Sequence, residues 1–339
     1  MTADRLRLHF NENTAGCSPA VIEALRTLTA CDIASYPDYE DVTAKVAAWL
    51  GVAGAQVLLT NGLDEGLYAI AQHGVRRGPG SDARFIQTDP TFEMFEEFAR
   101  IVGAGLVRID PEPDFGFPLE RVLAAITAHT RVIYLVDPNN PTGRPLPAGA
   151  AESIASAAPQ AIVLVDEAYA DFAGRTLIGQ VFERCPNLVV GRTFAKGHGL
   201  AGLRVGALVG HTATVAALRR MIPPFNVNVA AIRALDAALT DDTYLHWYVA
   251  QAVESRRAIA AFCERRGLTY WPSAGNFVLV RVGDRASGIT RDLAARGIDV
   301  RDKSAAPGCA GCLRLTAGVI AHTEQLITAL EDILASRTN

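Results

Sequence analysis

Long apolar runs, basic blocks and a hydrophobic leader are all missing from this sequence. No stretch approaches the ~18 consecutive apolar residues of a membrane-spanning helix, and no apolar signal core follows the first seven residues. The 32 Lys and Arg residues are balanced by 36 Asp and Glu, giving a formal net charge of −4 without a basic cluster. We therefore expect a cytoplasmic protein that binds neither membrane nor nucleic acid.

Cysteine is also scarce, with six in 339 residues, too few for a disulfide framework. Cys309 and Cys312 form a lone C-x-x-C, whereas a zinc site would need a second pair or two suitably spaced histidines. No G-x-G-x-x-G opens a helix after residues 56–60, and Lys196 lacks the following Ser or Thr of a Walker loop. We expect free thiols, no metal, and neither a nicotinamide-type nor a Walker-type site.

The composition is that of a globular chain, with 50% hydrophobic and 20% charged residues. Between residues 56 and 209, strand-like and helix-like patterns alternate, which predicts an α/β fold with a doubly wound, mostly parallel sheet. After Pro223-Pro224 the pattern changes to one long helix and a mixed αβ tail. We predict a large domain over residues 40–235 and a smaller α+β domain formed by residues 1–39 and 236–339.

Local signals in the sequence also predict where single helices and strands lie. Ser18-Pro19 supplies an N-cap and a first-turn proline, which predicts a helix to about Thr29. Apolar, β-branched runs predict the strands. These are 56–60, 84–88, 106–110, 131–136, 161–165, 187–190, 205–209, 277–282, 298–301 and 313–316.

Lys196 follows the strand-like run 187–190, and Arg204 lies eight positions further on. Most lysines are solvated surface residues, because burying the charge is costly unless the group is paired or used chemically. An amine condenses with an aldehyde to form an imine, and an arginine binds a phosphate. Pyridoxal 5′-phosphate carries both groups, so this pair points to that cofactor if matching residues lie elsewhere.

Polar motifs follow other predicted strands. Asp166 ends the run 161–165, and Asn140 lies in the turn-rich segment after 131–136. Asn61-Gly62 forms a turn between the first strand and a helix. The free N–H groups at the start of this helix suit a phosphate, although an ordinary βα turn would have the same sequence pattern. Because open α/β sheets bind ligands at the carboxyl ends of their strands, we expect these residues to lie together.

Taken in order, these motifs resemble the fold-type I pyridoxal-phosphate-dependent aminotransferases, most closely the histidinol-phosphate aminotransferase-like branch. The resemblance covers nearly the whole chain and implies an enzyme of the transaminase class. It rests on Phe10–Asn13, Tyr36-Pro37, Thr60–Glu65, Asp89–Phe92, Asn139–Gly143, Asp166–Tyr169, Lys196 with Arg204, Pro272–Phe277 and Gly311–Thr316.

The resemblance implies a role for each matching residue around the cofactor ring. Lys196 would form the imine and then move a proton between the substrate Cα and C4′ of the cofactor. Asp166 would face the pyridine nitrogen, and Tyr169 and Asn140 would hydrogen-bond the O3′ oxygen. Phe92 would stack on the ring, unless it is an ordinary core aromatic.

The phosphate of the cofactor would be held by Arg204, Thr193 and the backbone N–H groups of Leu63 and Asp64. Tyr36 would reach the cofactor phosphate of a neighbouring subunit, so the resemblance implies a homodimer.

On the substrate side, Arg314 matches the family's carboxylate-binding arginine, and Arg301 matches the arginine that binds a substrate phosphate; Asn140 would also face the substrate. Either arginine could instead be a surface charge. The chain departs from the branch at Ala195, usually Ser, which removes one hydrogen bond worth about 1 kcal/mol. It departs again at 14–16 and at Gly197-His198. We expect these changes to line the substrate side, with His198 either tuning the site near pH 7 or purely structural.

The expected reaction exchanges an amino group between a donor and a 2-oxo acid, with histidinol phosphate and 2-oxoglutarate, a pair from histidine biosynthesis, as the first candidates. An aromatic or specialised-metabolism amino acid aminotransferase and a threonine-phosphate-type decarboxylase remain alternatives. A cofactor-binding regulator is disfavoured, because no basic DNA-binding arm precedes the strand–helix pattern, which begins within ~50 residues of Met1.

Overall fold

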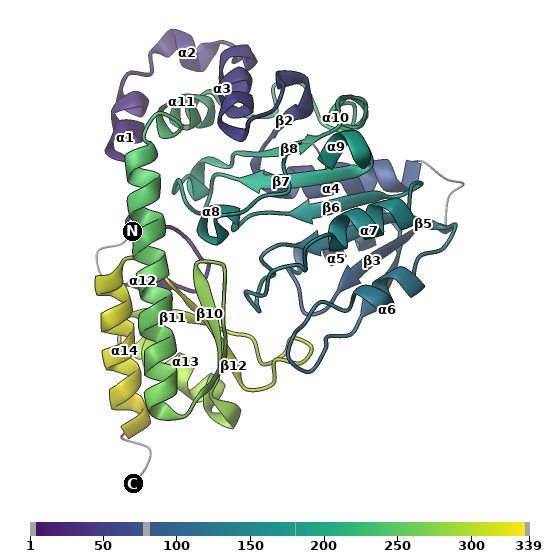
Figure 1. Ribbon diagram of the computed structural model, residues 1–339. Coiled ribbons are helices and arrows are strands. Elements are labelled where there is room, and N and C mark those ends of the chain that lie inside the picture. The colour runs from purple at the N-terminus through teal and green to yellow at the C-terminus, as the bar shows by residue number, and fades with distance from the viewer. Residues whose placement is uncertain (1–4, 77–81, 180, 336–339) are drawn as a thin grey trace.

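The computed structural model describes residues 5–76, 82–179 and 181–335. Two sheets organise it (Figure 1): one of seven strands in the order β2-β8-β7-β6-β5-β3-β4, and one of five in the order β1-β11-β12-β10-β9. The strands of the larger sheet are β2 (Val57–Thr60), β3 (Arg84–Thr88), β4 (Gly105–Ile109), β5 (Thr130–Val136), β6 (Ile162–Asp166), β7 (Leu188–Thr193) and β8 (Gly206–Gly210).

The larger sheet is mostly parallel, as predicted. Strand β8 runs antiparallel to both β2 and β7, and the other neighbouring pairs are parallel. All five residues of the central strand β6 are buried, as expected for a parallel strand in a sheet that is covered on both faces. Alternate side chains enter opposite cores: Val163 packs into one, and Leu164 packs into the other.

Helices cover both faces of this sheet, which confirms the predicted α/β fold. The core on one face includes side chains of α4 (Gly62–Arg76), α5 (Met94–Ile101) and α10 (Thr212–Arg219). The opposite core includes those of α6 (Leu119–Ala124), α7 (Ala150–Ala157) and α9 (Val181–Arg184), while α8 (Ala170–Ala173) follows β6. Near β2 and β8, a further core joins α1 (Pro19–Arg26), α3 (Glu40–Leu50) and α11 (Val229–Ala238).

The single helix predicted from Ser18 to about Thr29 is wrong at its end. Helix α1 begins as predicted, with the Ser18 side chain accepting a hydrogen bond from the N–H of Ala20. It stops at Arg26, and Thr29 instead caps a second helix, α2 (Ala30–Ala34). The Thr29 and Asp32 side chains form a reciprocal capping box there, which fixes the start of the new helix.

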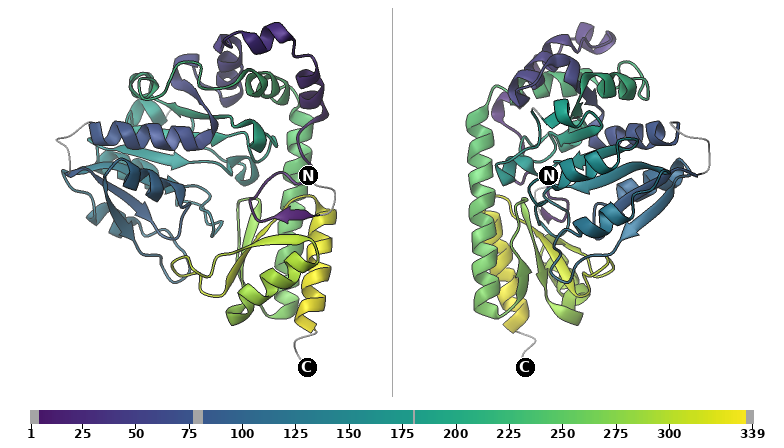
Figure 2. Two further views of the ribbon diagram at one scale, coloured as in Figure 1. Left: turned by 180° about the vertical axis from the view of Figure 1, so that it is seen from behind. Right: turned by 45° about the vertical axis from the view of Figure 1, so that its right-hand side comes forward.

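The five-stranded sheet joins the two ends of the chain. Strand β1 (Leu6–Leu8) pairs in parallel with β11 (Ile298–Asp302), and the other neighbours are antiparallel. The views in Figure 2 show α12 and α14 side by side along this sheet, where they share one core with α13. The remaining elements are β9 (Thr269–Trp271), β10 (Phe277–Arg281), β12 (Cys312–Thr316), α12 (Asp242–Arg266), α13 (Ala286–Ala295) and α14 (Ile320–Ala335).

Two three-residue strands, β1 and β9, were not predicted, because each is too short to show a period-two pattern. The domain boundaries at residues 40 and 235 stay a prediction. All six cysteines are free thiols. Across the described ranges, the helices fall short of the length and apolar character that crossing a membrane requires.

Candidate active site

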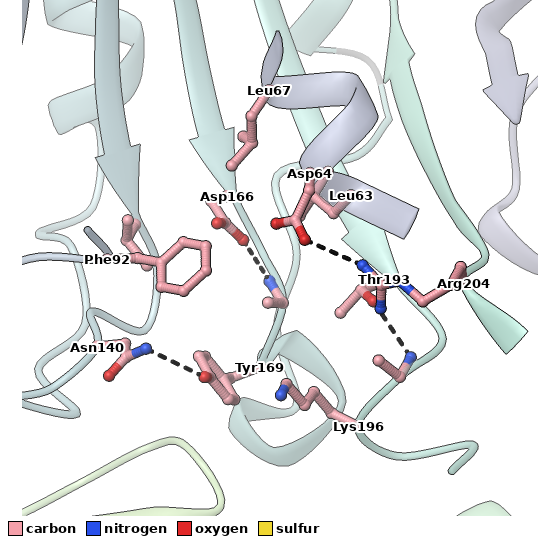
Figure 3. Close-up of a pocket in the computed structure, with 13 residues that line it drawn as sticks. Leu63, Asp64, Leu67, Phe92, Asn140, Asp166, Tyr169, Thr193, Lys196 and Arg204 are labelled. Carbon is pink, nitrogen blue, oxygen red and sulfur yellow. Dashed lines mark hydrogen bonds and ion pairs between the residues drawn. The ribbon is translucent and has the colours of Figure 1, made fainter. Parts of the chain in front are cut away.

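The candidate site lies where strands of the larger sheet end and the five-stranded sheet begins. An inner cavity of about 130 Å³ opens beside an outer cavity of about 590 Å³. Every residue predicted to bind the cofactor, apart from Tyr36, lines the inner cavity. Figure 3 shows Phe92, Asn140, Asp166, Tyr169 and Lys196 converging on it from separate loops and strand ends. The two cavities share Phe92, Asn140, Tyr169, Ala195, Lys196 and Arg204.

Asp166 is the last residue of β6 and is buried. Its carboxylate accepts hydrogen bonds from the Tyr134 hydroxyl at 2.8 Å and from the Ala168 N–H at 2.9 Å. Burial raises the pKa of Asp166 to about 6, and the two hydrogen bonds oppose that rise. The group is therefore mainly a carboxylate at neutral pH, and Tyr134 is a supporting residue that sequence reasoning missed.

Lys196 stands three residues beyond the end of β7, in a loop held by the buried side chain of Phe194. Its amine donates a hydrogen bond to the Phe10 carbonyl at 2.9 Å. Loss of hydration, reinforced by the positive charge of Arg314, lowers the pKa of Lys196 to about 8. A useful fraction of neutral amine is thus present near neutral pH, which condensation with an aldehyde requires.

Arg204 lies against the first turn of α4, where its guanidinium contacts the Asp64 carboxylate at 3.0 Å. Gly62 permits this approach, because a Cβ at that position would stand 2.6 Å from Arg204 Nη2. Gly206 does the same for the helix backbone, since its Cβ would meet Leu63 N at 2.8 Å. With the Thr193 hydroxyl on the same cavity wall, this end presents N–H donors, a hydroxyl and a guanidinium to one small space.

The Tyr169 hydroxyl receives two side-chain hydrogen bonds, from Asn11 Nδ2 at 3.1 Å and from Asn140 Nδ2 at 3.3 Å. Asn11 is a second residue without a predicted role, although it belongs to the motif Phe10–Asn13 that contributed to the resemblance. Phe92 lines both cavities, as its predicted position beside a ring requires.

The inner cavity fits pyridoxal 5′-phosphate in its chemistry. Lys196 supplies an amine for the aldehyde, and Asp166 supplies a buried carboxylate for the ring nitrogen. The start of α4 and Arg204 suit the phosphate, because glycines keep the space beside them clear. Apolar side chains complete the wall around a flat ring. These are Leu63, Leu67, Phe92, Val136, Ala168 and Ala195.

The outer cavity carries a cluster of cations from the five-stranded sheet. Arg301 and Arg314 are direct neighbours across β11 and β12. Arg314 is buried and donates to Asn140 Oδ1 at 2.6 Å and to the His9 carbonyl at 2.5 Å. Its Nε is buried and finds no hydrogen-bond partner among the described residues. Arg314 lines the outer cavity, where a guanidinium is suited to an anionic substrate group.

Some of the predicted residues lie away from both cavities. His198 was expected on the substrate side, and this is wrong: within the described chain it lines neither cavity and packs against Trp49 and Phe194. Segment 14–16 is likewise absent from the described lining of both cavities, whereas Ala195 lines both. Tyr36 lies outside the site of its own chain, 81% exposed and stacked on Phe225 with ring centroids 4.5 Å apart.

Comparisons with known proteins cover almost the whole chain. The family described as "Aminotransferase class I and II" matches residues 3–333. Histidinol-phosphate aminotransferase 1 of Thiobacillus denitrificans is 38% identical, over 98% of this chain and 86% of its own. The structure of histidinol-phosphate aminotransferase from Sinorhizobium meliloti, in complex with pyridoxal-5′-phosphate, is similar with a TM-score of 0.85 and 28% identity, covering 98% of this chain and 91% of its own. L-threonine-O-3-phosphate decarboxylase from Porphyromonas gingivalis, 23% identical with a TM-score of 0.80 over 97% and 99% of the two chains, shares the fold.

Proposed function

Since this chain belongs to the class I and II aminotransferase family and is a pyridoxal-phosphate-dependent transaminase, we propose that it transfers the amino group between histidinol phosphate and 2-oxoglutarate. The cationic outer cavity is the observation that carries this choice. Arg301, Arg314 and Lys303 line it together, within the same cavity as Lys196. That many cations beside a reactive amine favour a substrate with a strongly anionic end.

In this proposal the inner cavity holds the cofactor through the residues predicted from the sequence. Pyridoxal phosphate supplies an aldehyde carbon and a ring that withdraws electrons from the substrate Cα. Asp166, ionised at neutral pH, favours a proton on the ring nitrogen and so strengthens that withdrawal. Tyr169 and Asn140 donate toward the O3′ oxygen, and Phe92 covers the ring. Arg204, Thr193 and the N–H groups of Leu63 and Asp64 hold the phosphate.

Lys196 then acts as the proton carrier. Its amine lines both cavities, and its lowered pKa of about 8 allows it both to accept and to return a proton near neutral pH. Arg314 lines the outer cavity and would orient the carboxylate of the 2-oxo acid, while Asn140 holds the guanidinium in place. For a substrate that carries a Cα carboxylate, such as glutamate, aligning its Cα–H bond with Lys196 favours proton transfer over loss of carbon dioxide.

The active unit in this proposal is a cytoplasmic homodimer to which each subunit contributes Tyr36. Tyr36 and Ile33 are large hydrophobic side chains with 81% and 69% exposure, and Tyr36 stacks on the exposed Phe225. Such a cluster is typical of a surface that a second copy covers. We expect Tyr36→Phe to weaken cofactor binding a few-fold while sedimentation still detects a dimer. Full cofactor affinity in a monomeric fraction would contradict the shared site.

The proposed reaction can be tested by mixing the holoenzyme with single candidate donors and following conversion to the amino form of the cofactor by absorbance. Histidinol phosphate should convert it rapidly, and 2-oxoglutarate should restore the original spectrum. If only aromatic amino acids convert the cofactor to its amino form, then they, and not histidinol phosphate, are the amino donors. Carbon dioxide release from threonine phosphate without consumption of 2-oxoglutarate would reject transamination.

A further inference from the structure

Glu93 places a carboxylate inside the cationic end of the outer cavity. It lies just before α5, in the loop that follows β3, and lines the cavity together with Arg301 and Lys303 at the end of β11. One oxygen contacts Lys303 Nζ at 2.5 Å, and the other lies 3.8 Å from Arg301 Nη2. The neighbouring cations, with Lys303 the strongest influence, lower the pKa of Glu93, so it is ionised at neutral pH.

The two partners in this ion pair differ in exposure. The Lys303 side chain is 7% exposed, whereas that of Glu93 is 61% exposed. A buried ammonium needs an anionic partner in every state, because its charge cannot be rehydrated in place. Glu93 can swing into water and regain its hydration with little loss. The exposed carboxylate is therefore the exchangeable partner, and the buried lysine is the fixed one.

Among the described residues that line this cavity, Glu12 is the other carboxylate that could pair with Lys303. It pairs instead with Arg7 at 2.9 Å. Arg314 is held by Asn140 and the His9 carbonyl. Arg301, Lys303 and Glu93 thus form a local group with a formal charge of +1, which becomes +2 when Glu93 leaves.

We propose that Glu93 is a specificity-determining residue, a resident counter-ion that a phosphate dianion displaces from Lys303 and Arg301. The inference rests on the proposed function, because it assumes a phosphorylated substrate. A phosphate brings two charges and three acceptor oxygens to these cations, which outweighs the single charge of a carboxylate. A substrate without a phosphate leaves Glu93 on Lys303, so the buried ammonium stays paired through the other half-reaction.

Inorganic phosphate is the probe for this displacement, titrated calorimetrically into the holoenzyme, in which the cofactor already fills the site beside Arg204. Removing the competing charge with Glu93→Gln should tighten phosphate binding about fivefold, as expected for a largely exposed ion pair. Lys303→Gln should weaken it about tenfold. Glu97→Gln is the matched control, because Glu97 lies four residues away on α5 and pairs with the exposed Arg100. It should leave phosphate affinity unchanged.

Unchanged or weaker phosphate binding in Glu93→Gln, with its melting temperature at the wild-type value, would overturn the inference. Because Glu93 is largely exposed, we expect Glu93→Gln to fold as the wild type does, and the melting temperature checks this directly. A failure of the proposed function would be detected by a different measurement, the turnover of histidinol phosphate. If neither wild type nor variant turns over histidinol phosphate, the reaction is misassigned, yet a fivefold gain in phosphate affinity would still support the resident counter-ion.

Discussion

The inner and outer ends of the site are built differently. At the inner end, Asp166 and Lys196 are positioned by β6 and β7 of one sheet, and the Asp166 carboxylate is held by fixed donors. At the outer end, Arg314 comes from the five-stranded sheet and Glu93 from a loop of the larger one, and the charges there pair with one another across the cavity.

We infer from this difference that the inner end carries out the chemistry and the outer end selects the substrate. Asp166 is fixed by β6 and by two hydrogen-bond donors, so the inner end keeps one geometry for whatever substrate arrives. At the outer end, the exposed carboxylate of Glu93 can exchange partners at little energetic cost, although Arg314 and Lys303 are buried. Substitutions at the inner end should therefore affect cofactor attachment and kcat, and those at the outer end should affect KM and substrate choice.

Lys196→Ala should give the largest effect. The inner end then loses the amine that binds the aldehyde and carries the proton, so turnover should fall by roughly 10⁴-fold or more. Steady-state rates with histidinol phosphate measure this. Added methylamine should restore part of the rate by supplying a free base, whereas near-normal turnover without it would remove Lys196 from the reaction.

Asp166→Asn keeps the shape of the inner end and removes its negative charge. The ring nitrogen would then lose the partner that stabilises its proton, so kcat should fall on the order of 10²–10³-fold. Single-turnover kinetics with saturating cofactor separate this loss from weaker binding. A change confined to KM would assign Asp166 to substrate binding and contradict its proposed position beside the ring nitrogen.

Arg314→Lys tests the outer end. Lysine retains a positive charge, so its influence on the pKa of Lys196 persists, but it cannot form the fork that reaches Asn140, His9 and a substrate anion together. We expect KM to rise about 10–100-fold with the cofactor still attached. Equal losses of kcat and of the absorbance of bound cofactor would contradict the assignment of Arg314 to substrate binding alone.

Tyr134→Phe should have the smallest effect and refine the account of the inner end. The Tyr134 hydroxyl opposes the burial that raises the pKa of Asp166 to about 6, so its removal should raise that pKa further. Asp166 would then lose its charge at a higher pH, and the acid limb of the cofactor-binding profile should move up by roughly half to one pH unit. At pH 8 the two proteins should bind the cofactor alike. An unmoved acid limb would assign Tyr134 to packing alone.

The sequence was informative where a residue's position follows from its own strand. Asp166 ends a five-residue apolar run, and Lys196 follows another, so both could be placed at strand ends without knowing the pairing. The alternation of strands and helices likewise predicted the larger sheet. The roles assigned to these residues stay predictions until the variants are measured.

Residues whose neighbours are distant in sequence could not be found this way. Tyr134 reads as an ordinary core residue of an apolar strand, and its link to Asp166 depends on the register of β5 against β6. Glu93 and Lys303 are 210 positions apart, and nothing local marks either as the partner of the other. His198 was expected beside the substrate, but its surroundings depend on residues distant in sequence: it is buried against Trp49 and Phe194 and does not line either of the two described cavities.

The most direct test is to reduce the purified holoenzyme with borohydride, digest it and locate the cofactor by mass spectrometry. The account predicts a pyridoxyl phosphate group on the peptide that contains Lys196, with none on Lys45 or Lys303. Attachment to any other lysine, or a complete absence of reducible cofactor from a protein saturated with it, would contradict the central claim.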